Sequence, residues 1–225
     1  MQDDDGRIRK LGVWLRAFRE HALDLLARAS CAACAGPRAG KPPFCITCGE
    51  PAPALPCELD GVPLVVAGRY QAPLAPAIRR FKFEGHSELA PELARLLAPH
   101  LAVFELTSVR YVPVPLHRAR LVERGFNQSA LLAQRLAREL GGRAEPRLLE
   151  RVRVTQQQAQ LGREARAENV RGAFRVRRGV SGERVVLVDD VVTTGATARA
   201  CVGALRAAGS EVLLVAALAR AEGKF

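Results

Sequence analysis

The fold is decided by the stretch Val185-Val186-Leu187-Val188-Asp189-Asp190-Val191-Val192-Thr193-Thr194-Gly195-Ala196-Thr197. Its apolar start predicts a short buried strand over 184–188, and a helical pattern follows over 195–208. Two adjacent carboxylates stand where the strand is expected to end. In an open α/β sheet, ligands bind at the carboxyl ends of strands, so we expect a binding site at this junction.

The residues after the acidic pair predict a phosphate-binding loop. Hydroxyl groups and the backbone N–H groups of a helix start suit an anion, and a glycine permits close backbone approach. The predicted set is Thr193, Thr194, Gly195, Ala196 and Thr197. The alternative is an ordinary turn followed by a helix cap. The Gly-Lys-Ser/Thr ending of a Walker A loop is absent.

Two carboxylates beside a phosphate need a separate reason, because they repel the anion. Binding of sugar hydroxyls, or of a magnesium-bound diphosphate through water, supplies that reason. A ribose 5-phosphate fits both parts, with its phosphate on the loop and its 2- and 3-hydroxyls on Asp189 and Asp190.

Strands and helices alternate along most of the remaining chain. Strands are expected over 62–67, up to 115 and over 211–218, with helices over 75–83, 87–104 and 127–140. Residues 146–183 are polar and are predicted to be irregular. This alternation predicts an α/β fold with a largely parallel, doubly wound sheet flanked by helices.

An arginine-rich loop is predicted over 117–125. Arg118, Arg120 and Arg124 offer bidentate hydrogen bonds to a diphosphate or to nucleic acid phosphates. His117 is the candidate for proton transfer in this loop, with a plain surface histidine as the alternative.

The stretch from Val185 to Thr197 resembles the phosphoribosyl pyrophosphate (PRPP) binding motif of type I phosphoribosyltransferases. The resemblance implies that Asp189 and Asp190 act at the ribose and that Mg²⁺ accompanies PRPP. Purine-salvage members carry an aspartate base three places after the second acid, where this chain has Thr193. The pattern is nearer to the orotate type, whose loop lysine has no counterpart between Lys82 and Lys224.

Further motifs resemble the ComF family of competence-associated, phosphoribosyltransferase-like proteins. They are Pro113-Val114-Pro115, Arg124-Gly125-Phe126-Asn127-Gln128, Lys82-Phe83-Glu84-Gly85, Gln158-Ala159-Gln160-Leu161 and Asn169-Val170-Arg171-Gly172-Ala173-Phe174. Gly162 departs from the serine expected there. The resemblance runs from residue 31 to the end of the sequence. It implies a part in DNA uptake during natural transformation, with a helicase-like competence partner.

Four cysteines form two paired knuckles, Cys31-x-x-Cys34 and Cys45-x-x-Cys48. This spacing suits a tetrahedral thiolate site, and we expect structural Zn²⁺ in a small zinc-ribbon module, which the ComF resemblance also implies. Cys57 is an alternative ligand or a bystander. Cys201 is expected to be a small core residue.

The domain organisation expected from these patterns has three parts: an amphipathic N-terminal helix over 1–30, the zinc module over 31–58, and the phosphoribosyltransferase-like domain over 60–225. The longest apolar run, Val212 to Ala219, is too short to span a bilayer, and the N-terminus lacks the features of a secretory signal. We therefore expect a cytoplasmic protein without an integral membrane segment.

The formal net charge is +11, and only four of the 34 basic residues are lysines. Such a charge suits a polyanionic partner, including single-stranded DNA, although an arginine-rich genome would give the same composition. Two functions remain open. One is a ComF-like role in DNA handling with a PRPP site, which we favour, and the other is phosphoribosyl transfer to a nitrogenous acceptor. Whether there is turnover is left open, since neither an acceptor nor a general base is evident.

Overall fold

The computed structural model describes residues 30–39, 43–153, 170 and 172–221. The helix expected over 1–30 lies outside the described residues except for Ser30. The predicted motif at 158–161 and the departure at Gly162 also lie outside them.

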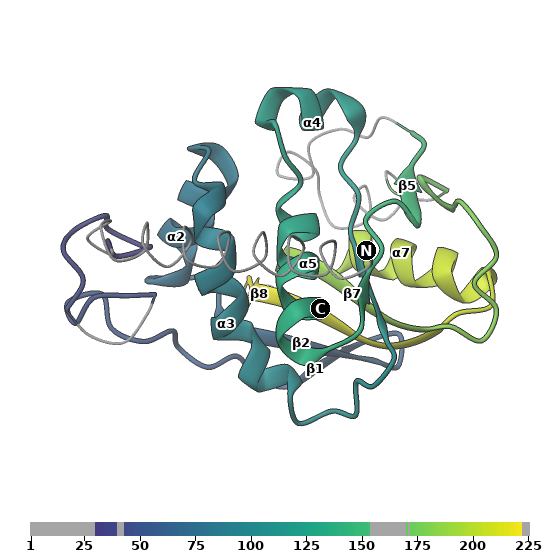
Figure 1. Ribbon diagram of the computed structural model, residues 1–225, viewed down its shortest axis with the longest axis horizontal. Coiled ribbons are helices and arrows are strands. Elements are labelled where there is room, and N and C mark those ends of the chain that lie inside the picture. Colours follow the sequence, from purple (N-terminus) through teal and green to yellow (C-terminus); the bar gives the residue numbers. More distant parts are fainter. Residues whose placement is uncertain (1–29, 40–42, 154–169, 171, 222–225) are drawn as a thin grey trace, which may run out of the picture.

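A six-stranded sheet forms the centre of the molecule, in the order β1-β2-β8-β7-β3-β4 (Figure 1). The strands are β1 Cys57–Leu59, β2 Val62–Arg69, β3 Arg110–Pro113, β4 Arg143–Ala144, β7 Arg184–Val192 and β8 Glu211–Arg220. Only the edge strand β1 is antiparallel to its neighbour, and every other pair is parallel. The predicted, largely parallel α/β sheet is confirmed.

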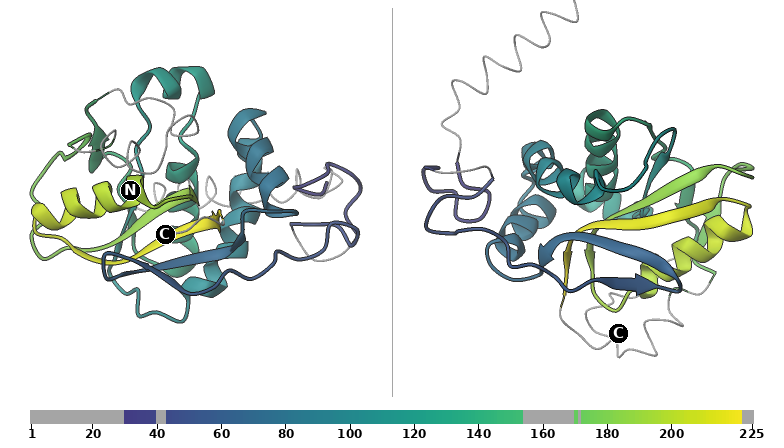
Figure 2. Two further views of the ribbon diagram at one scale, coloured as in Figure 1. Left: turned by 180° about the vertical axis from the view of Figure 1, so that it is seen from behind. Right: turned by 90° about the horizontal axis from the view of Figure 1, so that it is seen from below.

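Helices cover the sheet on both faces (Figure 2). One face packs against α2 Leu74–Phe83, the short 3₁₀ turn η1 Ser87–Leu89, α3 Ala90–Leu101 and α5 Gln128–Leu140. The other face packs against α7 Ala196–Ala207 and a small two-stranded sheet of β5 Leu149–Arg151 and β6 Phe174–Val176.

The central strand β7 shows why these residues form the core. Val186 and Val188 are buried on the α2/α3/α5 side, and Val185 and Leu187 are buried on the α7 side. Because successive side chains of a strand point to opposite faces, a strand covered on both faces is a continuous apolar run.

Several element boundaries differ from those expected. Strand β7 continues to Val192, so the acidic pair lies within the strand's last residues rather than after them. The helix expected over 87–104 begins as the 3₁₀ turn η1 and ends at Leu101. The region 146–183, predicted to be irregular, contributes β5 and β6.

The arginine-rich segment predicted as a loop contains a helix, α4 Arg118–Arg124, which projects from the top of the view in Figure 1. None of its residues is buried, so it lacks the apolar periodicity that reveals a helix. The residues that indicate this helix are those at its two ends. His117 caps its start, and Gly125 closes it with a φ of 77°, the left-handed conformation common after helices.

The cysteine-rich segment packs directly on α2 and α3. Cys31, Ala32 and Phe44 belong to the same buried cluster as the apolar faces of those helices. The Arg80 guanidinium of α2 donates from Nη1 to the carbonyl oxygens of Cys31 (3.0 Å) and Ala32 (2.9 Å). The segment is therefore held to the sheet domain by apolar contact and by specific hydrogen bonds.

None of the helices in the described part of the chain combines the length and the apolar character that crossing a membrane requires.

Candidate functional site

The acidic pair lies at the carboxyl end of β7. Asp190 is buried and Asp189 is half-buried. Each carboxylate accepts a hydrogen bond from the following backbone N–H, at 2.8 Å from Asp190 N to Asp189 Oδ1 and at 2.7 Å from Val191 N to Asp190 Oδ1. These bonds fix the orientation of both side chains at the end of the strand.

Burial and the neighbouring charge of Asp190 together raise the pKa of the Asp189 carboxyl to about 7. The positive charge of Lys82 and the hydroxyl of Ser129 act in the opposite direction, because both favour the ionised form. Asp189 is therefore a carboxyl group that exchanges its proton near neutral pH.

A lysine from a distant part of the sequence pairs with the second acid. Lys82 Nζ, at the end of α2, lies 3.0 Å from Asp190 Oδ1 and 2.8 Å from Oδ2. The start of α5 supports Lys82 and the first acid: Gln128 Nε2 donates to the Lys82 carbonyl oxygen (3.2 Å), and Ser129 Oγ donates to Asp189 Oδ1 (3.1 Å). The side chain of Asn127 caps α5 and so positions these two residues.

A cavity of about 410 Å³ opens over the acidic pair. Its lining residues are Tyr70, Lys82, Phe83, Val114, Pro115, Leu116, Arg120, Glu123, Arg124, Gln128, Ser129, Arg151, Asp189, Asp190, Val191, Thr193 and Thr197. Three carboxylates, those of Glu123, Asp189 and Asp190, and four basic side chains therefore share one cavity. This distribution suits a ligand that carries both hydroxyl groups and phosphates.

Two of the arginines are partly withdrawn from water. Burial lowers the pKa of Arg124, whose guanidinium lies over the Phe83 ring (4.9 Å to the centroid) and donates to Gln128 Oε1 (3.2 Å). Burial, followed by the charge of Arg120, lowers the pKa of Arg151, which lies over the Phe174 ring. Desolvated cations gathered around a cavity favour an anionic ligand.

The threonine-glycine loop surrounds a second, small cavity of about 30 Å³ beside the first, lined by Asp189, Val191, Val192, Thr193, Gly195, Ala196, Thr197 and Ala198. Gly195 has a φ of 78°, and a Cβ there would lie 2.6 Å from Leu59 Cδ2. Only glycine fits this turn, which brings the backbone of the helix start against the cavity.

Thr194 differs from its neighbours in the loop. Its Oγ1 is buried and has no hydrogen-bond partner among the residues that the structure describes. Its carbonyl oxygen accepts a hydrogen bond from Arg199 Nη1 (2.7 Å), and this bond ties the loop to α7. Four of the five residues predicted to bind phosphate thus line the small cavity, and Thr194 does not.

The structure divides the predicted basic residues into two groups. Arg120 and Arg124 line the large cavity, whereas Arg118 is exposed and neither it nor His117 is among the described residues that line it. His117 Nδ1 instead accepts from the Ala119 backbone N–H (3.3 Å) and caps α4. Its predicted proton-transfer role has no support in this position.

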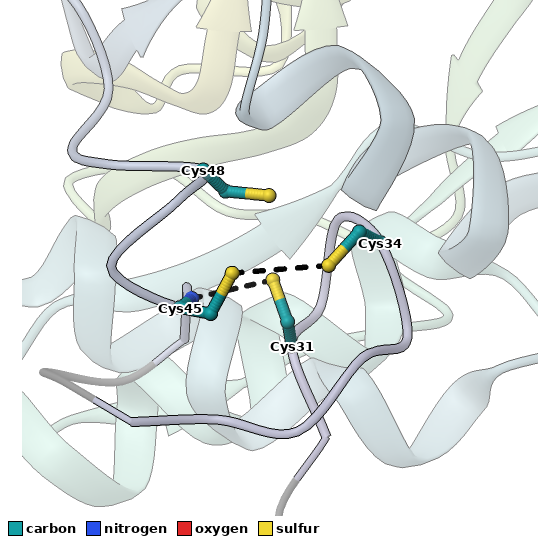
Figure 3. Close-up of side chains that lie close together, drawn as sticks. All are labelled: Cys31, Cys34, Cys45 and Cys48. Atoms are coloured by element: carbon teal, nitrogen blue, oxygen red, sulfur yellow. Dashed lines mark hydrogen bonds between the residues drawn. The ribbon is translucent and has the colours of Figure 1, made fainter.

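The four cysteines of the paired knuckles come together (Figure 3). Their Sγ atoms all lie within 4.8 Å of one another, and Cys34 Sγ and Cys45 Sγ are 3.8 Å apart. Ligand sulfurs around a tetrahedral zinc ion are separated by about 3.8 Å, as Zn–S bonds of about 2.3 Å require. The arrangement therefore fits a metal ion such as Zn²⁺.

The ionisation of these thiols points to the same conclusion. Burial alone would raise the pKa of Cys31, but backbone N–H groups around its sulfur lower it to about 6. The neighbouring Cys45 and burial raise the pKa of Cys48 to about 12. A bound cation would remove this conflict between adjacent thiolates. Cys57 lies on β1 and is not part of the group found among the described residues, and Cys201 is buried in α7 as a core residue.

The site contains four residues that the sequence patterns do not place there: Lys82, Gln128, Ser129 and Arg151. Lys82 and Gln128 were within motifs that resemble ComF, so motif membership was an available signal for these two. Ser129 and Arg151 had no signal of their own, because only the packing of α5 and β5 over β7 brings them to the acidic pair.

Comparison with known proteins identifies the family of this chain. A family model for the phosphoribosyl transferase domain matches residues 127–224. The DNA utilization protein YhgH of Salmonella typhi is 39% identical over 180 residues, which cover 74% of this chain and 79% of that protein. Competence protein F of Haemophilus influenzae is 37% identical over 168 residues, covering 70% of this chain and 72% of that protein.

Among solved structures, the adenine phosphoribosyltransferase of Leishmania tarentolae is similar at a TM-score of 0.37 and 17% identity, over 67% of this chain and 76% of that one. The assignment to a family rests on the sequence relatives, which cover more than two thirds of both chains. This chain belongs to the ComF family of competence protein F and DNA utilization protein YhgH, and it carries a phosphoribosyltransferase domain.

Proposed function

We propose that the protein serves DNA utilization, in the uptake of DNA during natural transformation, and that it binds PRPP with Mg²⁺ in the large cavity. One observation carries the PRPP assignment. The acidic pair lies between the threonine-glycine loop and a group of basic side chains, all lining adjoining cavities.

Each part of PRPP has a matching part of the site. Asp189 and Asp190 accept hydrogen bonds from the 2- and 3-hydroxyls of the ribose. The 5-phosphate lies in the small cavity, where Thr193 and Thr197 line the start of α7. Arg120 and Arg124 bind the pyrophosphate, together with the Mg²⁺ that such a group requires.

The DNA part of the proposal rests on the names of the relatives and on charge. The chain carries a formal net charge of +11, and α4 exposes Arg118 on the same helix as Arg120 and Arg124, which line the large cavity. Single-stranded DNA binds such surfaces through its phosphates. The proposed location is the cytoplasm, where thiols remain reduced and available for zinc. There a helicase-like partner would deliver the single-stranded DNA.

Calorimetric titration of zinc-loaded protein with PRPP and Mg²⁺, with and without single-stranded DNA, tests this function. We expect saturable PRPP binding that changes the affinity for DNA. The double variant Asp189→Asn with Asp190→Asn is the matched control, since it preserves side-chain shape but removes the charges, and it should bind PRPP much more weakly. Equal affinity in the double variant would overturn the ribose assignment.

A second candidate function is phosphoribosyl transfer to a nitrogenous acceptor. It is favoured by Asp189, whose pKa of about 7 suits a group that gives and takes a proton at neutral pH. Release of pyrophosphate from PRPP, measured across a panel of nitrogen nucleophiles, tests this activity. Acceptor-dependent release that disappears in Asp189→Asn would establish it, and no release with any acceptor would leave PRPP as a bound effector.

A further inference from the structure

Lys82 is the one lysine in the part of the chain that the structure describes, and its side chain lies in the large cavity. The chain otherwise uses arginine for nearly all its positive charge. Arginine and lysine differ here in a useful way. A guanidinium binds a carboxylate as a fixed planar fork, whereas an ammonium is a compact charge on a freely rotating stem. A lysine at this position therefore suits a charge that changes partners.

The ammonium group contacts the carboxylate that is proposed to bind the ribose. Lys82 Nζ contacts both carboxylate oxygens of Asp190, and Asp190 Oδ1 also accepts from the Val191 backbone N–H. Few acceptor positions remain on Asp190 for a sugar hydroxyl. A ribose hydroxyl that binds Asp190 therefore competes with Lys82 for the carboxylate oxygens.

The surroundings offer the displaced ammonium a second anionic partner. Lys82 lines the same cavity as Arg120 and Arg124, and its neighbour Phe83 is in contact with the Arg124 guanidinium. Its carbonyl oxygen stays fixed by Gln128 Nε2, so the side chain can rotate while the backbone remains in place. An anion held by the two arginines thus lies in the cavity that the lysine side chain already enters.

We propose that Lys82 is an exchangeable counter-ion that makes the site selective for a sugar phosphate that also carries a pyrophosphate group. The ribose displaces Lys82 from Asp190, and the ammonium then pairs with the pyrophosphate of the same ligand. This inference rests on the proposed PRPP function. A ribose 5-phosphate would break the Lys82–Asp190 pair without replacing it, whereas PRPP exchanges one ion pair for another.

The test compares PRPP and ribose 5-phosphate, each titrated with Mg²⁺ into zinc-loaded wild type and variants. Lys82→Met should weaken PRPP binding about tenfold or more, the scale of one charge-assisted contact. The same variant should bind ribose 5-phosphate as well as wild type or better, because no ion pair has to break. Lys82→Arg, which keeps the charge, should retain most of the PRPP affinity if Lys82→Met is poorly folded.

The control is Arg79→Met, which removes a positive charge from an exposed position of the same helix and should leave both affinities unchanged. Equal losses for the two ligands in Lys82→Met would overturn the inference, since Lys82 would then only position Asp190. Equal gains would overturn it too, because the lysine would only obstruct the site. Failure of the wild type to bind PRPP would instead overturn the proposed function itself, and the exchange with it.

Discussion

At the scale of single residues, Asp189 makes stability depend on pH. Its pKa in the folded protein is about 7, well above the unfolded value of about 3.9. Between these values the folded state holds a proton that the unfolded state has lost, so this group lowers the free energy of unfolding as pH rises from about 4 to about 7. Below the unfolded pKa it has no such effect.

Urea denaturation at pH 5 and pH 8 measures this effect. We expect the wild type to lose stability between the two pH values relative to Asp189→Asn, which cannot ionise. The variant should be the more stable of the two at pH 8, provided that no ligand is bound. Parallel pH profiles for the two proteins would contradict the assignment of this titration to Asp189.

The threonines of the threonine-glycine loop should also behave differently from one another. Thr197 lines both cavities, whereas the Thr194 hydroxyl is buried. Thr197→Val should weaken binding of ribose 5-phosphate about tenfold, because a hydroxyl donor to a phosphate is lost. Thr194→Val, its matched control, should leave binding unchanged and leave stability equal or slightly higher, since it removes a buried hydroxyl without a described partner.

At the scale of elements, α2 connects the metal site with the acidic pair. Arg80 holds the carbonyl oxygens of Cys31 and Ala32, and two residues later Lys82 holds Asp190. Removal of zinc should loosen the knuckle around Cys31, lower the melting temperature and weaken PRPP binding through α2.

Chelator-treated and zinc-loaded protein can be compared by thermal melting and by PRPP titration. Cys34→Ser should reproduce the loss caused by the chelator, and Cys57→Ser should not, because Cys57 lies outside the described metal-binding group. Zinc-free protein with an unchanged PRPP affinity would show that the two sites are independent.

The elements that sequence patterns predicted well are those whose information is contiguous. The acidic pair, the threonine-glycine loop and each cysteine pair are short contiguous motifs, and their presence at one cavity or in one cysteine cluster agrees with the predicted grouping. The central strands were predicted because a buried parallel strand is an apolar run. Helix α4 was missed, since an exposed helix rich in arginine has no apolar face.

What could not be predicted depends on contacts between distant residues. The pairing of Lys82 with Asp190 joins positions 108 apart in the sequence, and that of Ser129 with Asp189 joins positions 60 apart. No periodicity encodes such a contact. The split between Arg120 and Arg118 likewise depends on which side of α4 faces the large cavity.

At the scale of the whole molecule, the positive charge should divide between the cavity and the outer surface. Arg124→Ala should weaken PRPP binding about tenfold, because it removes a charge-assisted contact inside the cavity. Arg118→Ala should spare PRPP but weaken single-stranded DNA binding and reduce its salt dependence, by about 0.7 in the slope for one lost phosphate contact. Salt titrations of DNA affinity for both variants check this division, and equal effects on both ligands would contradict it.

The four successive residues that end α2 each make a different contact. Arg80 reaches the cysteine segment, Phe81 is buried in the core beside Phe126, Lys82 reaches Asp190, and Phe83 lies under Arg124. Each step along a helix turns the side chain by about 100°. One alanine inserted before Arg80 would therefore rotate all four at once, and metal retention, core packing and ligand affinity should fail together. The number of residues in α2 before Arg80 thus fixes the directions of these four side chains, whatever the identity of the residues in that part of the helix.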